Sequence, residues 1–168
     1  MGIKQLEKRI KSRPGKLKEL CNIAVPGEGS SHAKIMIVGQ NPGKDEEIEG
    51  KPFVGKAGKF LNKILNENGI ERKNLFITNV VKHKTHRNKI PTKKEIELWK
   101  PFLEEEINIL KPKIIVLLGG IAEKNTPRLK GIRYIETYHP SAAMRFKEIR
   151  IKFEKDIRLL KEEIKKFD

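Results

Sequence analysis

The stretch Ile35-Met36-Ile37-Val38-Gly39-Gln40-Asn41-Pro42-Gly43 decides the fold of this chain. Four consecutive apolar residues that run into a Gly-Gln-Asn-Pro-Gly turn are typical of a buried strand ending in a tight polar loop. In an open α/β sheet, ligands bind just beyond the carboxyl ends of the strands. The turn at 39–43 is therefore the first candidate for a functional site.

Strands and helices alternate along the chain on both sides of this stretch. Strands are expected at 33–39, 75–81, 113–118 and 132–137, and the main helices at 56–68, 92–110 and 149–164. The nearly all-apolar segment 113–118 belongs inside a sheet, whereas the more polar 132–137 belongs at its edge. Pro101 is expected to bend or divide its helix. The pattern predicts an α/β fold, a three-layer sandwich with a four-stranded parallel sheet flanked by helices.

The length of 168 residues suits a single domain spanning 1–168, with residues 1–24 as a basic, helical N-terminal segment interrupted at Arg13-Pro14-Gly15. Residues 25–31 and 44–50 are expected to be loops because of their Gly, Pro and charged composition. No apolar run approaches the roughly 20 residues that cross a bilayer, and the N-terminus lacks the apolar core of a signal peptide. A soluble, cytoplasmic protein without a membrane partner is expected.

The net charge of +15 indicates a partner that is anionic, such as nucleic acid. A thermophile surface rich in Lys and Glu is the other explanation, and both can hold. The single cysteine, Cys21, excludes an internal disulfide and a multi-thiolate metal site within one chain. With no histidine near it in sequence, Cys21 is interpreted as a bystander rather than a catalytic thiol.

Three polar side chains occupy the carboxyl ends of different predicted strands: Asn41, Asn79 and His139. Parallel topology brings these ends to one edge, together with Phe53 on the loop beyond the first strand. An aromatic face, two amides and a histidine suit a planar heterocycle, since stacking holds the ring and amides pair with its edge. Singly, each has a structural explanation: a turn cap for Asn79, a backbone-bonded ring for His139 and core packing for Phe53. Their convergence favours a site.

The segment 50–57, Gly-Lys-Pro-Phe-Val-Gly-Lys-Ala, is close to a phosphate-binding P-loop. Its last residue is Ala57, so the hydroxyl that would hold magnesium is missing. Pro52 also removes one of the backbone amides that such a loop uses to hold phosphate. A nucleoside-triphosphate site is therefore not predicted.

Taken together, these residues resemble the uracil-DNA glycosylase superfamily, and most of all its iron–sulfur thermophile branch, family 4. The resemblance covers about residues 33–155. It is carried by Ile37-Val38-Gly39 with Pro42-Gly43, by 50–59, by Ile77-Thr78-Asn79-Val80-Val81-Lys82, by 111–116 and by Tyr138-His139-Pro140-Ser141. The four-stranded parallel sheet of that family agrees with the strand pattern read from the residues.

The resemblance implies a role for each residue at the strand ends. Phe53 stacks on a flipped-out uracil, and Asn79 reads the uracil edge that separates it from cytosine. His139 donates to uracil O2, where negative charge develops as the glycosidic bond breaks. Asn41, with the Pro42 carbonyl, holds the attacking water, and Gln40 is expected to bind the base beside it.

The resemblance also implies contacts with the DNA strand. Ser141 pins a backbone phosphate, and one of Ala143, Met144 and Arg145 enters the gap left by the flipped nucleotide. The segment from Lys82 to Lys94 carries six Lys or Arg residues, two histidines and no acid until Glu95. Lys82, Lys84 and Arg87 from it are expected to bind DNA phosphates.

This chain departs from family 4 at its metal centre. The branch binds its cluster through four cysteines, whereas this chain has one, and it places His83 and Trp99 where the branch has cysteines after the second strand and in the following helix. Neither an iron–sulfur cluster nor another metal or cofactor is expected.

The water-holding turn departs as well. It reads GQNPG where the branch usually reads GEAPG, and Asn41 resembles the mismatch-specific and single-strand-selective uracil glycosylases. An uncharged asparagine orients water but does not act as a base. Gly43 stands where the most efficient branch has a tyrosine that excludes thymine, so exclusion of a C5 methyl must come from elsewhere or be loose.

The sequence predicts a monomeric, monofunctional glycosylase that hydrolyses the N-glycosidic bond of deoxyuridine in DNA. One alternative is a glycosylase for another deaminated or mismatched base, such as hypoxanthine or thymine. Another is a catalytically weak protein that binds uracil-containing or abasic DNA without turning it over.

Overall fold

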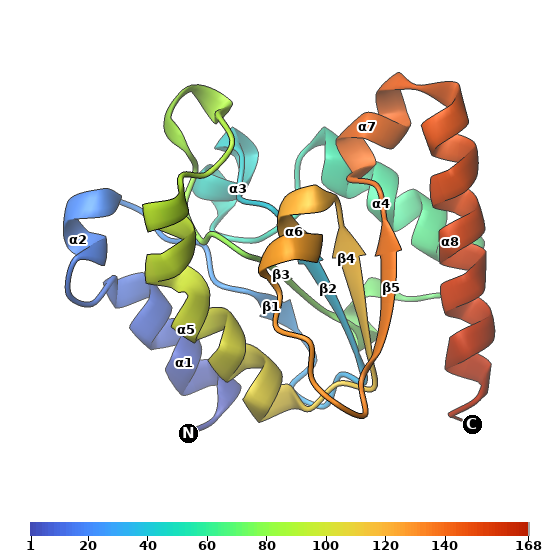
Figure 1. Cartoon of the computed structure of the whole chain (residues 1–168), viewed down its shortest axis with the longest axis horizontal. Helices are drawn as coiled ribbons and strands as arrows, with labels where there is room; N and C mark the ends of the chain where they lie inside the picture. Colours follow the sequence, from blue (N-terminus) through green and yellow to red (C-terminus); the bar gives the residue numbers. More distant parts are fainter. Residues whose placement is uncertain (168) are drawn as a thin grey trace.

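Five strands form one sheet in the order β1-β3-β2-β4-β5 between two layers of helices, in a computed structural model that describes residues 1–167 (Figure 1). The strands are β1 (Glu28–Gly29), β2 (Ile35–Gly39), β3 (Phe76–Asn79), β4 (Ile114–Leu118) and β5 (Arg133–Thr137). β2 pairs in parallel with β3 on one side and β4 on the other, and β5 continues the parallel sheet at its edge. The predicted fold class and its four parallel strands are confirmed.

Alternating residues of the strands face the two helical layers, as the period of two in a strand requires. Met36 and Val38 point into a core shared with α1 and α5, whereas Ile35 and Ile37 point into a second core with α4 and α8. Every residue of β2 and β4 is buried. Apolar side chains on both faces explain why these strands lack a polar alternation in the sequence.

The helices lie close to their predicted places. They are α1 (Ile3–Ser12), α2 (Leu17–Leu20), α3 (Lys44–Glu49), α4 (Lys56–Glu67), α5 (Lys93–Leu110), α6 (Gly120–Asn125), α7 (Pro140–Arg145) and α8 (Lys147–Lys165), with short 3-10 turns at Arg72–Asn74 and His86–Asn88. The N-terminal segment is interrupted as expected, since Arg13 ends α1 in the left-handed region at φ 50°. α5 begins with the expected capping box between Thr92 and Glu95.

Three local predictions were wrong. Residues 28–29 form a two-residue strand antiparallel to β3, so the sheet has a fifth strand where a loop was expected. Residues 44–49 form α3, which buries no residue and therefore shows no apolar period; Glu46 instead accepts from the backbone N–H of Gly43 at its start. Of the two outcomes expected at Pro101, a bend or a division, the division was wrong: α5 is continuous through Pro101, which is exposed, so water can bond the carbonyl that the proline leaves free.

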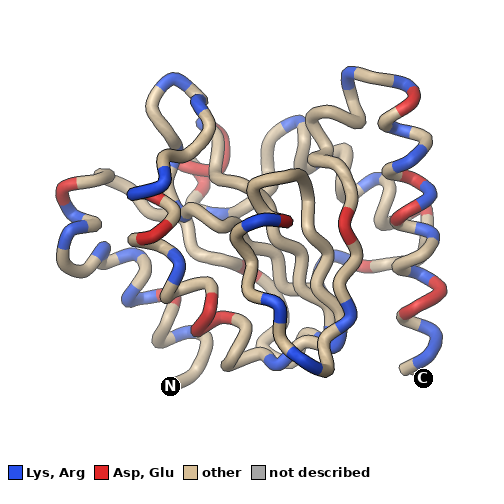
Figure 2. The backbone as a smooth tube through the Cα atoms, viewed as in Figure 1, with Lys and Arg blue, Asp and Glu red and all other residues tan. Residues whose placement is uncertain are grey.

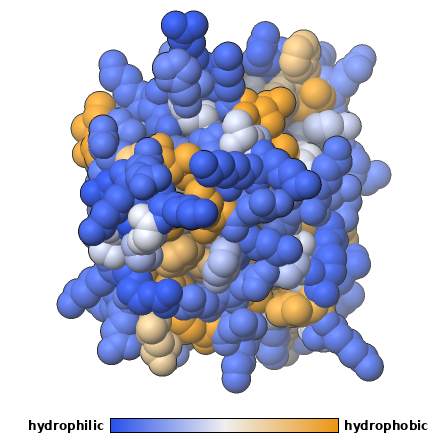
Figure 3. Space-filling model, turned by 60° about the vertical axis from the view of Figure 1, so that its left-hand side comes forward, coloured by the Kyte–Doolittle hydropathy of each residue, from blue (hydrophilic) through white to orange (hydrophobic). Residues whose placement is uncertain are grey.

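Within residues 1–167, no helix is both long enough and apolar enough to cross a membrane. The helical face formed by α1, α2 and α5 is covered mainly by hydrophilic residues, with apolar ones in small separate areas (Figure 3).

Candidate active site

A pocket of about 560 Å³ opens at the carboxyl ends of the parallel strands. It is lined by the turn after β2, by the loop that carries Phe53, by Asn79 at the end of β3 and by His139 after β5. The predicted residues that it brings together are Gln40, Asn41, Phe53, Asn79, His139 and Ser141. The remaining lining side chains come mainly from the starts of α3 and α4 and from Asn88.

Gly39 is the residue that allows the back of this pocket to close. A Cβ at this position would lie 2.4 Å from the Phe53 ring and 2.5 Å from Oδ1 of Asn79. Both distances are far inside van der Waals contact. Any side chain at 39 would displace the aromatic ring and the amide together, so the glycine of the turn is a packing requirement of the site.

Asn79 presents an unused hydrogen-bond acceptor. The residue is 2% exposed, and its Oδ1 has no partner among the described residues. A buried polar atom without a partner costs about 1–3 kcal/mol, so its presence in a pocket points to a ligand that donates to it.

His139 is held as a neutral donor. Its Nδ1 accepts from the backbone N–H of Ser141 at 3.1 Å, with the Ser141 hydroxyl 2.8 Å away. Burial lowers the pKa of His139 to about 4, against an opposing effect of Glu46. Since Nδ1 is an acceptor, the proton of the neutral ring is on Nε2. This nitrogen is therefore the one that can donate to a ligand.

The Phe53 loop is held in a strained conformation from two sides. Phe53 has φ 52°, which is rare for a residue with a side chain. Arg72 donates to the carbonyl oxygens of Phe53, at 2.6 Å, and Pro52. Glu46 accepts from the backbone N–H groups of Val54 and Gly55 at 2.9 and 2.7 Å. The ring centroid of Phe53 lies 5.7 Å from that of His139, tilted by 31°.

Glu46 and Arg72 were missed by sequence reasoning. Glu46 bonds to Gly43 as well as to the Phe53 loop, and so joins the two loops that form the pocket mouth. Its position three residues after Gly43, at a helix start, is the signal that could have found it. Arg72 lies far from both loops in sequence, and nothing local marks it.

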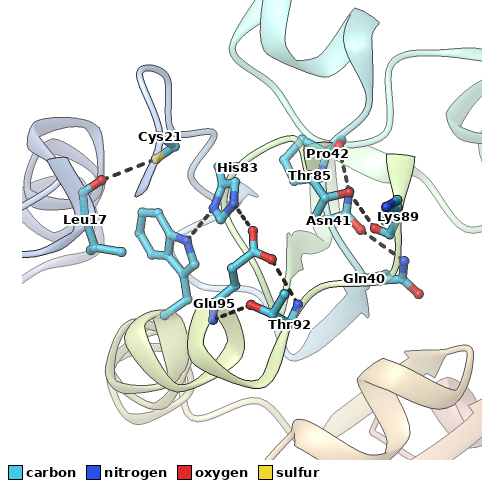
Figure 4. A network of polar contacts seen from close by, with 11 residues as sticks. Leu17, Cys21, Gln40, Asn41, Pro42, His83, Thr85, Lys89, Thr92 and Glu95 are labelled. Atoms are coloured by element: carbon cyan, nitrogen blue, oxygen red, sulfur yellow. Dashed lines mark hydrogen bonds and ion pairs between the residues drawn. The ribbon is translucent and has the colours of Figure 1, made fainter. Parts of the chain in front are cut away.

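The turn after β2 forms a small hydrogen-bonded unit. Nδ2 of Asn41 donates to the Pro42 carbonyl at 2.9 Å, and its Oδ1 accepts from the Gln40 side chain at 3.0 Å (Figure 4). Gln40 and Asn41 are both partly exposed on the pocket wall. The amide of Asn41 is therefore oriented by its neighbours, with a second lone pair of Oδ1 left for water.

Two residues expected to contact DNA are buried instead, and these predictions were wrong. Lys82 is fully buried and paired with Glu106 at 2.6 Å, and it also donates to Thr78 at 2.8 Å and to the carbonyl of Asn79 at 2.6 Å. Ala143 is 1% exposed in the core beneath α7, so it cannot enter a base stack.

The other residues expected on the DNA side are accessible. Lys84 is partly exposed and Arg87 is exposed, on the loop that rises from the sheet before α5 and bears Lys and Arg at its tip (Figure 2). On α7, Ser141 and Arg145 are exposed and Met144 is 45% exposed. The surface around the pocket is therefore basic on the loop side and partly apolar on the α7 side.

The residues present do not fit an iron–sulfur cluster. Cys21, the only cysteine, directs its Sγ at the Leu17 carbonyl 3.7 Å away, and burial raises the pKa of its thiol to about 11. Both ring nitrogens of His83 already have partners, Trp99 and Glu95 (Figure 4). Among residues 1–167, no group of three or more His, Cys, Asp or Glu could hold a metal ion.

Comparison with known proteins points to one family through a family model and several relatives. Residues 26–164 match the family model described as the uracil DNA glycosylase superfamily. The chain is 39% identical over 162 residues to the type-4 uracil-DNA glycosylase of Saccharolobus solfataricus, covering 83% of this chain and 75% of that protein. It is 37% identical over 160 residues to the type-4 enzyme of Thermotoga maritima, covering 84% and 83%. A type-5 uracil-DNA glycosylase of Pyrobaculum aerophilum is 26% identical over 148 residues, covering 70% and 65%. By its fold, its strand-end pocket and these matches, the chain belongs to the uracil-DNA glycosylase superfamily.

Proposed function

We propose that this protein is a monofunctional DNA glycosylase that hydrolyses the N-glycosidic bond of deoxyuridine in DNA. The observation that carries the proposal is the buried Oδ1 of Asn79, which has no partner within residues 1–167 and lies in the same pocket as the Nε2–H of His139. Uracil offers an N3–H donor on its edge and an O2 acceptor beside the bond to be broken. Cytosine has an acceptor at N3, which would face Oδ1 unfavourably. The names of the relatives point to the same substrate.

In this mechanism the uracil leaves as an anion. The deoxyribose C1′–N1 bond breaks, its electron pair passes to the base, and the charge gathers on N1 and O2. A neutral His139 that donates from Nε2 stabilises this charge more than it stabilises the intact substrate. Phe53 would stack on the ring and Asn79 would bind N3–H, so that a base with an N3–H edge, uracil rather than cytosine, places O2 against His139.

Water completes the reaction at C1′. Asn41 and the Pro42 carbonyl, joined by the 2.9 Å hydrogen bond, would hold the water, which adds to C1′ and releases its proton to solvent. Because Asn41 carries no charge, it orients the water without taking its proton. Gln40 would bind at the same end of the base. This proposal uses no metal and no cofactor.

DNA would reach the pocket between the basic loop and α7. Lys84 and Arg87 on one side, and Ser141 and Arg145 on the other, would bind backbone phosphates. With Ala143 buried, Met144 is the exposed apolar side chain placed to fill the gap that a flipped nucleotide leaves. A monomer is sufficient for this arrangement, since the pocket is lined by one chain.

The test is base release from oligonucleotides that carry one uracil, as U·G, U·A and single strands, in buffer with a chelator. Alkali-labile sites should appear with the wild-type protein and be strongly reduced with His139→Ala. Intact strands from all three substrates would refute the proposal. Tight binding without base release in single-turnover assays would instead support a DNA-binding protein with little catalysis.

A second candidate substrate class rests on Gly43, which lines the pocket without a side chain. No side chain at position 43 excludes a C5 methyl or a larger damaged base. A panel of oligonucleotides carrying uracil, mismatched thymine or hypoxanthine separates the two candidates. Release of thymine or hypoxanthine faster than uracil would favour the second.

A further inference from the structure

The loop between β3 and α5 depends on its base for its position. This segment, residues 84–91, is called the basic loop here; it carries Lys84 and Arg87, and its Asn88 lines the pocket. Residues 86–90 are exposed, and Arg87 and Asn88 have φ of 53° and 56°. A loop whose tip has so little burial has a low cost of local opening.

A hydrogen-bond network that is buried at His83 and Trp99 and more exposed at Thr92 joins the two ends of this loop. At the first end, His83 is 3% exposed and its Nε2 lies 2.5 Å from Oε2 of Glu95. At the second end, Oε1 of the same carboxylate accepts from the backbone N–H of Thr92 at 2.9 Å. Trp99, one turn further along α5, donates its indole N–H to Nδ1 of His83 at 2.8 Å. Figure 4 shows the His83 ring directed at the Glu95 carboxylate, which also faces Thr92.

The proton positions in this network follow from its chemistry. An indole N–H only donates, so Nδ1 of His83 must accept and the imidazole proton must be on Nε2, facing Glu95. Burial alone would raise the pKa of Glu95, but the hydrogen bonds from Thr92 and His83 lower it below its ordinary value. Every polar atom named in the network therefore has a matched partner, and such networks rigidify the backbone that they connect.

The backbone segment that leads into His83 is hydrogen-bonded to the water-holding turn. After β3, Val80 and Val81 donate their backbone N–H groups to the carbonyls of Gly39 and Gln40, at 2.9 and 3.0 Å. His83 follows two residues later. The base of the loop is therefore attached to the pocket wall. A change in the backbone conformation at His83 would move Asn88 relative to the pocket.

We propose that the His83–Glu95–Trp99 network positions the basic loop for DNA, and that it takes the structural place of the iron–sulfur cluster that the resemblance to family 4 implies. The DNA-binding part of this inference rests on the proposed function. The positioning of the loop and the replacement of the cluster rest on the same two residues. His83 and Trp99 stand where the branch has cysteines, and they form a hydrogen bond with each other instead of binding iron. His83, Glu95 and Trp99 act as positioning residues and do not touch the substrate.

Trp99→Phe is the first variant, since it keeps a six-membered aromatic ring in the core and removes the N–H donor together with the five-membered ring that carries it. Glu95→Gln is the second variant, because one amide oxygen cannot accept from Thr92 and His83 in the way that two carboxylate oxygens do. Tyr134→Phe is the matched control. Its hydroxyl also makes two hydrogen bonds, to Leu129 and Pro127, but away from the loop and pocket.

Three measurements test the proposal. Hydrogen exchange of the Asn88 and Lys89 amides, which bond to Thr85 and His86 in the loop, should speed up about threefold to tenfold in both network variants and stay unchanged in Tyr134→Phe. Affinity for DNA with an abasic-site analogue should fall by a similar factor, while the single-turnover rate at saturating protein is retained. Purified wild-type protein should contain no iron by elemental analysis and show no visible absorption.

Loop exchange that is unchanged in both network variants would overturn the positioning role. Iron in amounts close to one cluster per chain would overturn the replacement of the cluster. Absence of uracil release by the wild type would refute the proposed function alone, because amide exchange and iron content are measured without substrate.

Discussion

The backbone N–H of Ser141 donates to Nδ1 of His139 at 3.1 Å, and this contact decides which ring nitrogen can serve as a donor in the pocket. Protonation of the ring would put a second donor opposite the Ser141 N–H. Together with burial, which lowers the pKa of His139 to about 4, this keeps the imidazole neutral at pH 7.

Uracil release should therefore not depend on His139 ionisation near neutrality and should fall as the pH approaches about 4. The free energy of unfolding should also decrease as the pH falls. Because the folded-state pKa lies below the ordinary value of 6.5, the contribution of neutral His139 to the free energy of unfolding is lost as the pH falls from about 6.5 through about 4. Thermal unfolding of wild type and His139→Gln over this range measures it. The loss should be smaller in the variant, and equal losses would contradict the assignment.

Asn79→Ala should lower uracil release by about 100-fold or more, the effect of removing one aligned hydrogen-bonding group from a developing charge or from a base edge. Stability should not fall in parallel, since in the wild type this buried Oδ1 has no partner in the described part of the chain, at a cost of about 1–3 kcal/mol. Single-turnover rates and thermal unfolding of the same protein measure both quantities. Loss of activity that merely follows loss of folding would argue for a structural asparagine.

Asn41→Asp should raise the rate of uracil release by about tenfold. A carboxylate that accepts the proton of the attacking water raises the rate about 10²–10⁴-fold. Replacing the Nδ2–H group that now donates to the Pro42 carbonyl costs about 1–3 kcal/mol, which cancels part of this gain. The gain should increase with pH as the new carboxyl ionises. Asn41→Ala, which can neither orient nor activate water, is the comparison and should be slower than wild type. A slower Asn41→Asp protein would place the attacking water elsewhere.

Glu106→Gln should destabilise the fold by about 3–5 kcal/mol, because it leaves the fully buried ammonium of Lys82 without its counter-charge. Burial lowers the pKa of Lys82, so the variant should recover stability as the pH rises and the amine becomes neutral. Chemical denaturation at several pH values measures this. Lys82→Met in the Glu106→Gln background should restore part of the loss, and no recovery in either experiment would contradict the buried pair.

Met144→Ala should reduce release of uracil from duplex DNA more than from single strands, because only the duplex has a base stack to hold open. Phe146→Ala is the matched control, since Phe146 is also exposed (52%) at the end of α7. The ratio of duplex to single-strand rates is the quantity to compare. An equal loss on both substrates would remove Met144 from this role.

Most of the fold was predictable from local patterns. The apolar runs at 35–38 and 114–118 and the helical period of 57–65 each reflect burial of a whole element, and burial leaves a period in the sequence. Two of the elements that escaped prediction, β1 and α3, bury no residue. Their stability comes from sheet pairing and from Glu46, which are contacts that a short polar segment does not reveal.

The sequence by itself determined the α/β class and the strand-end residues Asn41, Asn79 and His139 that meet in the pocket, since parallel topology brings the ends of strands to one edge. Only the tertiary structure decided which charged and apolar side chains of the same motifs face DNA. Lys82 and Ala143 point into the core, where Glu106 pairs with the lysine, because the direction of a side chain beyond a strand end depends on packing partners far away in sequence. The turn at 39–43 carries the side chains of Gln40 and Asn41, but the geometry of the pocket beside it is set by Phe53, Glu46 and Arg72, which only the folded chain brings to it.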